Sequence, residues 1–185
     1  MNLKNKSNFY LSCVAAILSA LSTVFVYFMH FPNAIGGYIH IGDAIVYLTA
    51  ALLPKPYAAV SAAMGFGLAD LLSGYPVYIL PSAFIRALVV LCFTAKKNKI
   101  LCRRNYAALP LSLVITVGGY FITKYIIYQF INKMPEVAVT KAVASVPGNI
   151  IQCASSAVVF ILVSIALDKM NFKEKIKLSG VNKNV

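Results

Sequence analysis

The sequence predicts an all-α integral membrane protein, a bundle of six transmembrane helices whose N- and C-termini both lie in the cytoplasm. Two observations predict the bundle. The chain has 60% hydrophobic and only 12% charged residues with a mean hydropathy of +0.79, which is too apolar for a soluble domain of this size. Long apolar segments also recur along the chain between polar or Pro/Gly-containing breaks. The distribution of the basic residues predicts the orientation.

The apolar segments account for one membrane domain over residues 1–170, followed by a basic cytoplasmic tail over residues 171–185. The first segment follows two lysines as in a signal peptide, but it is too long for one and is interpreted as a retained helix. The second and third are short for a ~30 Å hydrocarbon core, so they are either tilted helices or a re-entrant hairpin. The six segments are 9–29, 41–53, 57–72, 77–95, 107–131 and 145–167.

The basic residues predict the orientation of these helices. With the N-terminus inside, 13 of the 17 Lys and Arg residues lie on the cytoplasmic side and only Lys133 and Lys141 lie in an external loop. This asymmetry is the positive-inside pattern of membrane proteins. The 13 cytoplasmic residues are Lys4, Lys6, Lys55, Lys96, Lys97, Lys99, Arg103, Arg104, Lys169, Lys173, Lys175, Lys177 and Lys183.

The same distribution argues against a nucleic-acid interface, although the formal net charge is +12. The basic residues occur in short runs between apolar segments, with no compact soluble face to carry them. The four cysteines show no C-x-x-C spacing and are expected to be free thiols. Motifs of hydrolases, metalloproteases and P-loop ATPases are absent, so neither a cofactor, a metal site nor catalytic activity is expected.

Polar residues inside the apolar segments are the first candidates for a binding site, because charge in a membrane span is costly unless it faces a cavity or a partner. In the predicted topology they converge on the outer half of the bundle, and the inner half is expected to be nearly all aliphatic. A cavity that opens outward is therefore predicted. The six residues are Asp43, Asp70, Arg86, Lys124, Asn149 and Gln152.

Four of these residues also have a structural interpretation. Arg86 and Asp70 are candidates for an ion pair between neighbouring helices. Asp43 follows Ile-Gly before an apolar run, which suits a helix N-cap. Lys124 is long enough to extend its amine to the membrane interface.

Aromatic residues near the same outer face are candidates for stacking on a ligand, with membrane-interface anchoring as the alternative. They are Tyr38, Tyr75, Tyr78 and Tyr120. The glycine-rich and apolar segment from Phe31 to Gly42 is unlike a solvated connector, and we hypothesise that it folds over the cavity as a lid. His40, in this segment, joins the candidate substrate-binding residues.

Small residues repeat on the first predicted helix as Ala16-x-x-x-Ala20, with Ala15 and Ser19 beside them. Such spacing lets a second helix approach closely. It is compatible both with packing inside the bundle and with docking of a partner subunit.

Two segments of the chain have a specific sequence pattern: G-G-Y-I-H-I-G-D-A-I-V-Y-L-T-A-A-L-L-P-K-P-Y-A-A-V from Gly36 to Val60 and G-L-A-D-L-L-S-G-Y-P-V-Y from Gly67 to Tyr78. In these segments the chain resembles the substrate-binding S components of energy-coupling factor (ECF) vitamin transporters. The later P-G-N-I-I-Q, Pro147 to Gln152, is similar to the sixth-helix pocket segment of that group.

The resemblance implies a binding subunit in the bacterial plasma membrane, with a transmembrane coupling subunit and two ATPase subunits as partners. It implies that Ala16 and Ala20 dock on the coupling subunit, that substrate binds at the outer face, and that the whole subunit topples during transport. The small organic substrate is expected to be a pyrimidine, pyridine or deazapurine compound. The chain lacks the Met-His start of nickel and cobalt members.

The residues alone leave two other classes of function as alternatives. A small membrane enzyme acting on a lipid or peptide would use Asp70 and Asp43 as acid and base, and these carboxylates would have to converge on one substrate. A stand-alone secondary transporter typically has an internal repeat and a site at the midplane. No repeat is visible in the sequence.

Overall fold

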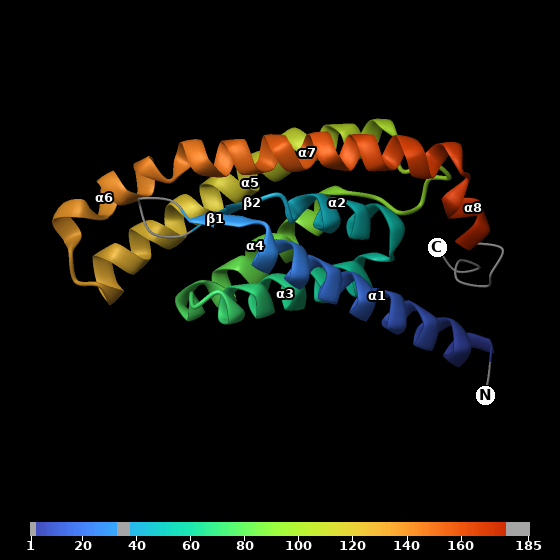
Figure 1. The fold of residues 1–185 in the computed structure, drawn as a ribbon, viewed down its shortest axis with the longest axis horizontal. Coiled ribbons are helices and arrows are strands. Elements are labelled where there is room, and N and C mark those ends of the chain that lie inside the picture. The colour runs from blue at the N-terminus through green and yellow to red at the C-terminus, as the bar shows by residue number, and fades with distance from the viewer. Residues whose placement is uncertain (1–2, 33–37, 177–185) are drawn as a thin grey trace.

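The computed structural model describes residues 3–32 and 38–176, and this part of the chain is almost entirely helical (Figure 1). Its long helices run roughly along the longest axis of the molecule. The elements in chain order are α1 (Leu3–Phe28), β1 (His30–Pro32), β2 (Tyr38–His40), α2 (Asp43–Leu52), α3 (Lys55–Leu72), the 3₁₀ turn η1 (Pro76–Tyr78), α4 (Ile79–Cys92), α5 (Arg103–Ile126), the π-helical turn η2 (Ile127–Ile131), α6 (Pro135–Ala144), α7 (Val146–Lys169) and α8 (Phe172–Ile176).

All six predicted apolar segments form helices. Within the described residues, three helical stretches are long and apolar enough to cross a bilayer: Asn8–Phe28, Arg103–Ile131 and Pro135–Lys169. Asp43–Leu52 and Pro76–Cys92 are shorter apolar helices. The number of six spans and the cytoplasmic position of the termini stay predictions.

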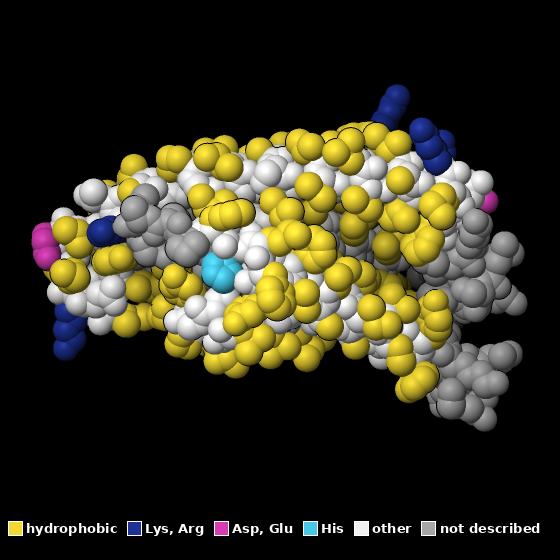
Figure 2. Space-filling view, in the orientation of Figure 1, with side chains coloured by type: hydrophobic (Ala, Val, Ile, Leu, Met, Phe, Trp, Pro, Cys, Tyr) yellow, Lys and Arg dark blue, Asp and Glu magenta, His cyan; other side chains and the backbone are white. Residues whose placement is uncertain are grey.

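The distribution of side chains in space agrees with a membrane protein. On the face seen in Figure 2, apolar side chains cover the middle of the molecule, while Lys and Arg side chains lie at its two ends. In Figure 1, the beginning of α1, the α4–α5 loop and α8 lie at the same end, which we call the α8 end. The loop and both termini were predicted to share the cytoplasmic side.

Proline residues divide the short helices. Leu53 is extended (φ −100°, ψ 154°) because it precedes Pro54, so α2 ends at Leu52 and α3 begins at Lys55. The predicted external loop before residue 145 is largely helical: Pro135 occupies the first turn of α6, and Pro147 occupies that of α7. Ala138 and Ala142 of α6 are buried, and α6 contacts α5. The prediction of a loop there missed an amphipathic helix.

Small residues bring α1 and α3 close together. A Cβ atom on Gly65 would lie 2.8 Å from the carbonyl oxygen of Ser19, so only glycine fits this crossing. Two hydroxyls link the same helices: Thr23 donates to the Gly65 carbonyl at 2.9 Å, and Ser61 donates to the Ala15 carbonyl at 2.8 Å. The α1–α3 contact therefore has helix packing typical of membrane proteins.

The predicted lid segment contains a short antiparallel hairpin. β1 pairs with β2 in the register His30 to His40 and Pro32 to Tyr38. Residues 33–37, on which the lid hypothesis also depends, lie outside the described residues. His40 at the end of β2 is 4% exposed, so the second strand places a histidine inside the bundle.

The α8 end is fastened by specific hydrogen bonds. The Asp168 carboxylate accepts bonds from the backbone amides of Ile100 and Leu101 at 2.8 and 2.9 Å. The buried Lys173 amine donates to the carbonyls of Ala95 and Lys97 at 3.0 and 2.8 Å. The α4–α5 loop is thus held against the end of α7 and the beginning of α8.

The core corrects one expectation about the inner half of the bundle. Tyr47, Phe93 and Phe160 form an aromatic cluster with ring centroids 5.2–5.9 Å apart. Besides aliphatic residues, α5 and α7 also bury polar ones: Asn105, Ser112, Ser156 and Ser164. The Ser112 hydroxyl is satisfied within its own helix, because it donates to the Leu109 carbonyl at 2.7 Å.

Candidate functional site

A buried ion pair lies where α2, α4 and α7 meet. Asp43, the first residue of α2, and Arg86 of α4 are both fully buried, and their Oδ1 and Nη2 atoms are 2.9 Å apart. The Gln152 side-chain amide of α7 donates to Asp43 Oδ2 at 3.0 Å. Asp43 therefore connects α2 to two other helices through its two carboxylate oxygens.

Arg86 is held on its other sides as well. Its Nη1 donates to the Thr116 hydroxyl of α5 at 2.9 Å. The guanidinium carbon lies 4.7 Å from the centroid of the Phe66 ring and 5.5 Å from that of Tyr120. These contacts fit cation–π stabilisation of a charge that has no access to water. Arg86 Nε has no hydrogen-bond partner within the described residues.

These contacts decide two of the structural interpretations. Arg86 pairs with Asp43 rather than with Asp70. Asp43 makes no side-chain capping bond; Gly42 occupies the N-cap position, and the Asp43 carboxylate points to Arg86 and Gln152 instead. Lys124 is 5% exposed, so its amine does not extend to the surface.

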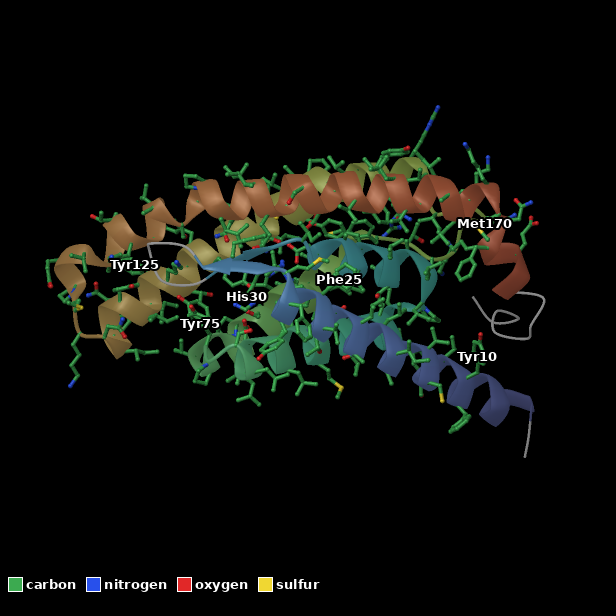
Figure 3. All side chains as sticks on the ribbon, viewed as in Figure 1. Tyr10, Phe25, His30, Tyr75, Tyr125 and Met170 are labelled. Atoms are coloured by element: carbon green, nitrogen blue, oxygen red, sulfur yellow. The ribbon has the colours of Figure 1, made fainter. Side chains whose placement is uncertain are left out.

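A small cavity lies beside the ion pair, with a volume of about 40 Å³. It collects residues from the β2 strand and from α3, η1, α4, α5 and α7, that is, from segments far apart in sequence. Figure 3 marks Tyr75, one of its lining residues, just beyond the end of α3 that lies away from the α8 end. The lining residues are His40, Asp70, Tyr75, Tyr78, Ser82, Tyr120, Lys124, Ser145, Asn149 and Gln152.

Tyrosines form one side of this cavity. The ring centroids of Tyr75 and Tyr78 are 6.4 Å apart, and those of Tyr78 and Tyr120 are 6.5 Å apart. The Tyr120 hydroxyl is hydrogen-bonded to Ser82 at 2.8 Å, which fixes the position of its ring. The cavity thus offers aromatic faces beside polar groups, the combination typical of sites for small organic molecules.

Asn149 and Asp70 add hydrogen-bonding capacity to the cavity. The Asn149 Nδ2 atom is buried and has no hydrogen-bond partner among the described residues. A buried amide donor without a partner is costly, so it is suited to a ligand acceptor. Asp70, 4% exposed, places a carboxylate in the same wall, so the cavity has both donors and acceptors.

His40 joins the hairpin to the cavity. Its Nδ1 accepts a hydrogen bond from the Gly42 amide at 3.2 Å, and its ring packs edge-on against Phe66 with centroids 5.3 Å apart. Burial, followed by the charges of Arg86 and His30, holds the pKa of His40 well below its usual range. The imidazole in this connection between α1 and α2 is therefore neutral near pH 7.

The predicted site residues fall into three groups. His40, Asp70, Tyr75, Tyr78, Tyr120, Lys124, Asn149 and Gln152 line the cavity. Asp43 and Arg86 lie behind it as a supporting ion pair. For Tyr38 only the backbone, in β2, is described. Ligand contact by any of them stays a prediction. Sequence reasoning missed Ser82 and Ser145, because a serine in an apolar helix carries no sequence signal for a ligand.

A separate groove lies between α1 and α3, with a volume of about 490 Å³. All four small residues line the groove: Ala15 and Ser19 are buried, and Ala16 and Ala20 are exposed. The remaining wall comes from α3 residues such as Tyr57, Val60 and Met64. The two pairs therefore differ in exposure: Ala15 and Ser19 also contact α3 through Ser61 and Gly65, whereas Ala16 and Ala20 are open to a partner.

The helical membrane architecture and the cavity of polar and aromatic residues define the class of a membrane protein that binds a small molecule. Within the described residues, no group of three potential metal ligands occurs. The chain matches the family described as "ECF-type riboflavin transporter, S component" over residues 7–169, and it belongs to this family. It is thus a substrate-binding subunit of an ECF transporter, in a family of transporter components and not of enzymes. A search of curated proteins returns no match.

The ion pair gives a first prediction. Asp43→Asn should lower the free energy of unfolding by about 3–5 kcal/mol because it leaves the Arg86 charge buried without a counter-ion. The double variant Asp43→Asn/Arg86→Met, which removes both charges, should lose less than Asp43→Asn alone. Thermal unfolding in detergent measures both, with Arg103→Met at an exposed arginine as the control, expected to change stability by less than about 0.5 kcal/mol. Equal losses in the single and double variants would contradict this account.

His40 gives a prediction for pH. Its pKa is lowered in the folded protein, so below about pH 6.5 the unfolded chain gains a proton that the folded chain does not. The stability contributed by neutral His40 is complete above that pH and decreases as the pH falls below it. The melting temperature should therefore drop between pH 7.5 and pH 5, and the drop should be smaller in His40→Gln. Identical pH profiles for the two proteins would show that His40 is not responsible.

Proposed function

We propose that this chain is the substrate-binding subunit of an ATP-driven ECF importer and captures a flat nitrogen heterocycle at the outer face of the membrane. The observation that carries the proposal is the convergence of eight residues singled out from the sequence on one cavity, together with the family to which the chain belongs. Tyr75, Tyr78 and Tyr120 supply aromatic faces for a planar ring. Asn149, Gln152 and Asp70 supply hydrogen-bonding groups for its heteroatoms.

The positions of Asp43 and Asp70 favour a binding protein over an enzyme. The enzyme hypothesis needs Asp43 and Asp70 to act together on one substrate. Asp43 is instead occupied by Arg86 and Gln152 and does not line the cavity. Asp70 alone faces the cavity, where it suits a hydrogen bond to a ring N–H or an exocyclic amine.

The substrate must widen this cavity. Its volume of about 40 Å³ accommodates water molecules, whereas pockets for organic ligands typically measure roughly 300 Å³ or more. We infer that the walls separate when substrate enters, and that Tyr78 is well placed to move because it lies on the short η1 turn rather than inside a long helix.

Two substrate groups fit the chemistry of the cavity. Pyrimidine, pyridine and deazapurine compounds are the groups that the sequence resemblance favours, such as hydroxymethylpyrimidine, a vitamin B6 form or a queuosine precursor. Riboflavin is favoured by the description of the matched family. Both groups have flat nitrogen-containing rings, and a binding panel that contains all four compounds separates them.

The groove between α1 and α3 is proposed as the docking face for the transmembrane coupling subunit, which in turn binds two ATPase subunits. Ala16 and Ala20 are exposed on it at a spacing that brings both to one side of α1. Small side chains permit a close helix–helix approach in a membrane. The groove and the cavity have no lining residue in common, so docking and ligand binding use different surfaces.

Removal of the Asn149 amide gives a prediction for binding. Asn149→Ala should weaken the binding of the best ligand in the panel about tenfold or more, because a buried hydrogen bond to the ligand is lost. Isothermal titration in detergent measures the dissociation constant, and Asn98→Ala, at an exposed position in the α4–α5 loop, is the control. An unchanged dissociation constant in folded Asn149→Ala would exclude Asn149 from the site.

Filling the groove gives a prediction for transport. Ala16→Leu/Ala20→Leu should abolish most uptake of the ligand by cells or vesicles that contain the coupling and ATPase subunits, because the larger side chains block close packing. Ligand binding by the isolated subunit should be unchanged. Ala154→Leu/Ala166→Leu, at exposed positions of α7, serves as the matched control. Intact uptake in the α1 double variant would refute this docking face.

A further inference from the structure

A second apolar groove lies between α4 and α5, on the half of the molecule toward the α8 end. Its volume is about 560 Å³. It contributes neither to the cavity nor to the α1–α3 groove. Its lining is aliphatic apart from Cys92 and one charged residue, Arg104; the main lining residues are Leu88 and Leu91 of α4, and Arg104, Ala107, Leu111 and Ile115 of α5.

The length of the groove matches one leaflet of a bilayer. Arg104 and Ile115 lie on the same helix, 11 positions apart, which corresponds to roughly 16 Å at 1.5 Å rise per residue. Half of a ~30 Å hydrocarbon core is about 15 Å. With Arg104 at the predicted cytoplasmic surface, the groove therefore extends to about the middle of the membrane.

The surface end of the groove is positively charged. Arg104 is exposed there and lines the groove. The adjoining loop adds the exposed Lys96, Lys97 and Lys99. Its position is fixed, because Asp168 and Lys173 hold the loop backbone through four hydrogen bonds. The negatively charged Asp168 carboxylate accepts hydrogen bonds from two backbone amides of this loop.

We propose that this groove binds an anionic phospholipid of the inner leaflet, with its phosphate at Arg104 and one acyl chain along α5. Charge complementarity at the mouth selects an anionic headgroup, and the aliphatic lining accommodates the chain. A partner helix fits less well. Leu88, Leu91 and Leu111 project into the groove, and at 36%, 48% and 51% exposure they keep a second helix at a distance that small residues would not.

Native mass spectrometry of the full chain, released from detergent with added lipid, tests the proposal. Phosphatidylglycerol and phosphatidylcholine with identical acyl chains are the probes, so that only the headgroup differs. The wild-type protein should retain phosphatidylglycerol in preference to phosphatidylcholine. Arg104→Gln should reduce phosphatidylglycerol binding about fivefold, the effect of one basic residue near an anionic surface. Arg103→Gln, a neighbouring exposed arginine that does not line the groove, is the matched control and should bind as the wild type does.

A second variant distinguishes the contribution of the apolar groove to lipid binding from that of the headgroup charge. Ala107→Phe fills the groove and leaves every charge in place, so it should lower the retention of both lipids. Equal loss in Arg103→Gln and Arg104→Gln would overturn the proposal and show only general attraction to a basic surface. Equal retention of both lipids by the wild type, or normal retention by Ala107→Phe, would overturn it as well.

Discussion

The ion pair between Asp43 and Arg86 is the interaction on which the arrangement of the site depends. Two opposite charges buried among apolar helices are tolerated only when they compensate each other and when their remaining polar atoms are satisfied. Gln152 and Thr116 provide most of that satisfaction, and Phe66 and Tyr120 surround the guanidinium with aromatic rings. Through these contacts the pair determines how α2, α4, α5 and α7 meet.

The cavity lies beside this pair and uses the geometry that it fixes. Gln152 belongs to both: its amide bonds Asp43, and its side chain lines the cavity. Tyr120 has the same double position, with its ring beside Arg86 and its hydroxyl bonded to Ser82. A ligand that displaces either residue therefore acts on the ion pair as well. Binding of a ligand in the cavity would therefore alter the contacts of several helices at once.

The two grooves on the surface of the molecule differ in the size of the residues that line them. On α1, small residues line the groove beside α3, and two of them, Ala16 and Ala20, are exposed. Between α4 and α5, bulky leucines line a groove whose mouth is basic. Small residues favour helix contact, and long aliphatic residues beside a cation favour lipid. The two grooves thus suit different neighbours in the same membrane.

Much of the fold and the candidate site was predictable from the sequence. Apolar segment length predicts the helices, and the cost of charge in a membrane singles out Arg86, Asp43 and Lys124 without any structure. The pairing of Arg86 with Asp43 rather than Asp70 was not predictable, because it depends on which helices are neighbours in space. The helix α6 was missed because its polar residues resemble those of a loop. Ser82, Ser145 and the buried serines of α5 and α7 were missed because an isolated serine is equally compatible with a bond to its own helix.

The most direct test of the account is the mass spectrometry of small molecules released by denaturation of the protein after purification in mild detergent. The wild type should release a co-purified flat nitrogen heterocycle, which is a flavin or a pyrimidine, pyridine or deazapurine compound, and folded Asn149→Ala should release much less of it. An undiminished amount of the same compound from Asn149→Ala, or release of a non-planar compound from the wild type, would contradict the proposed site.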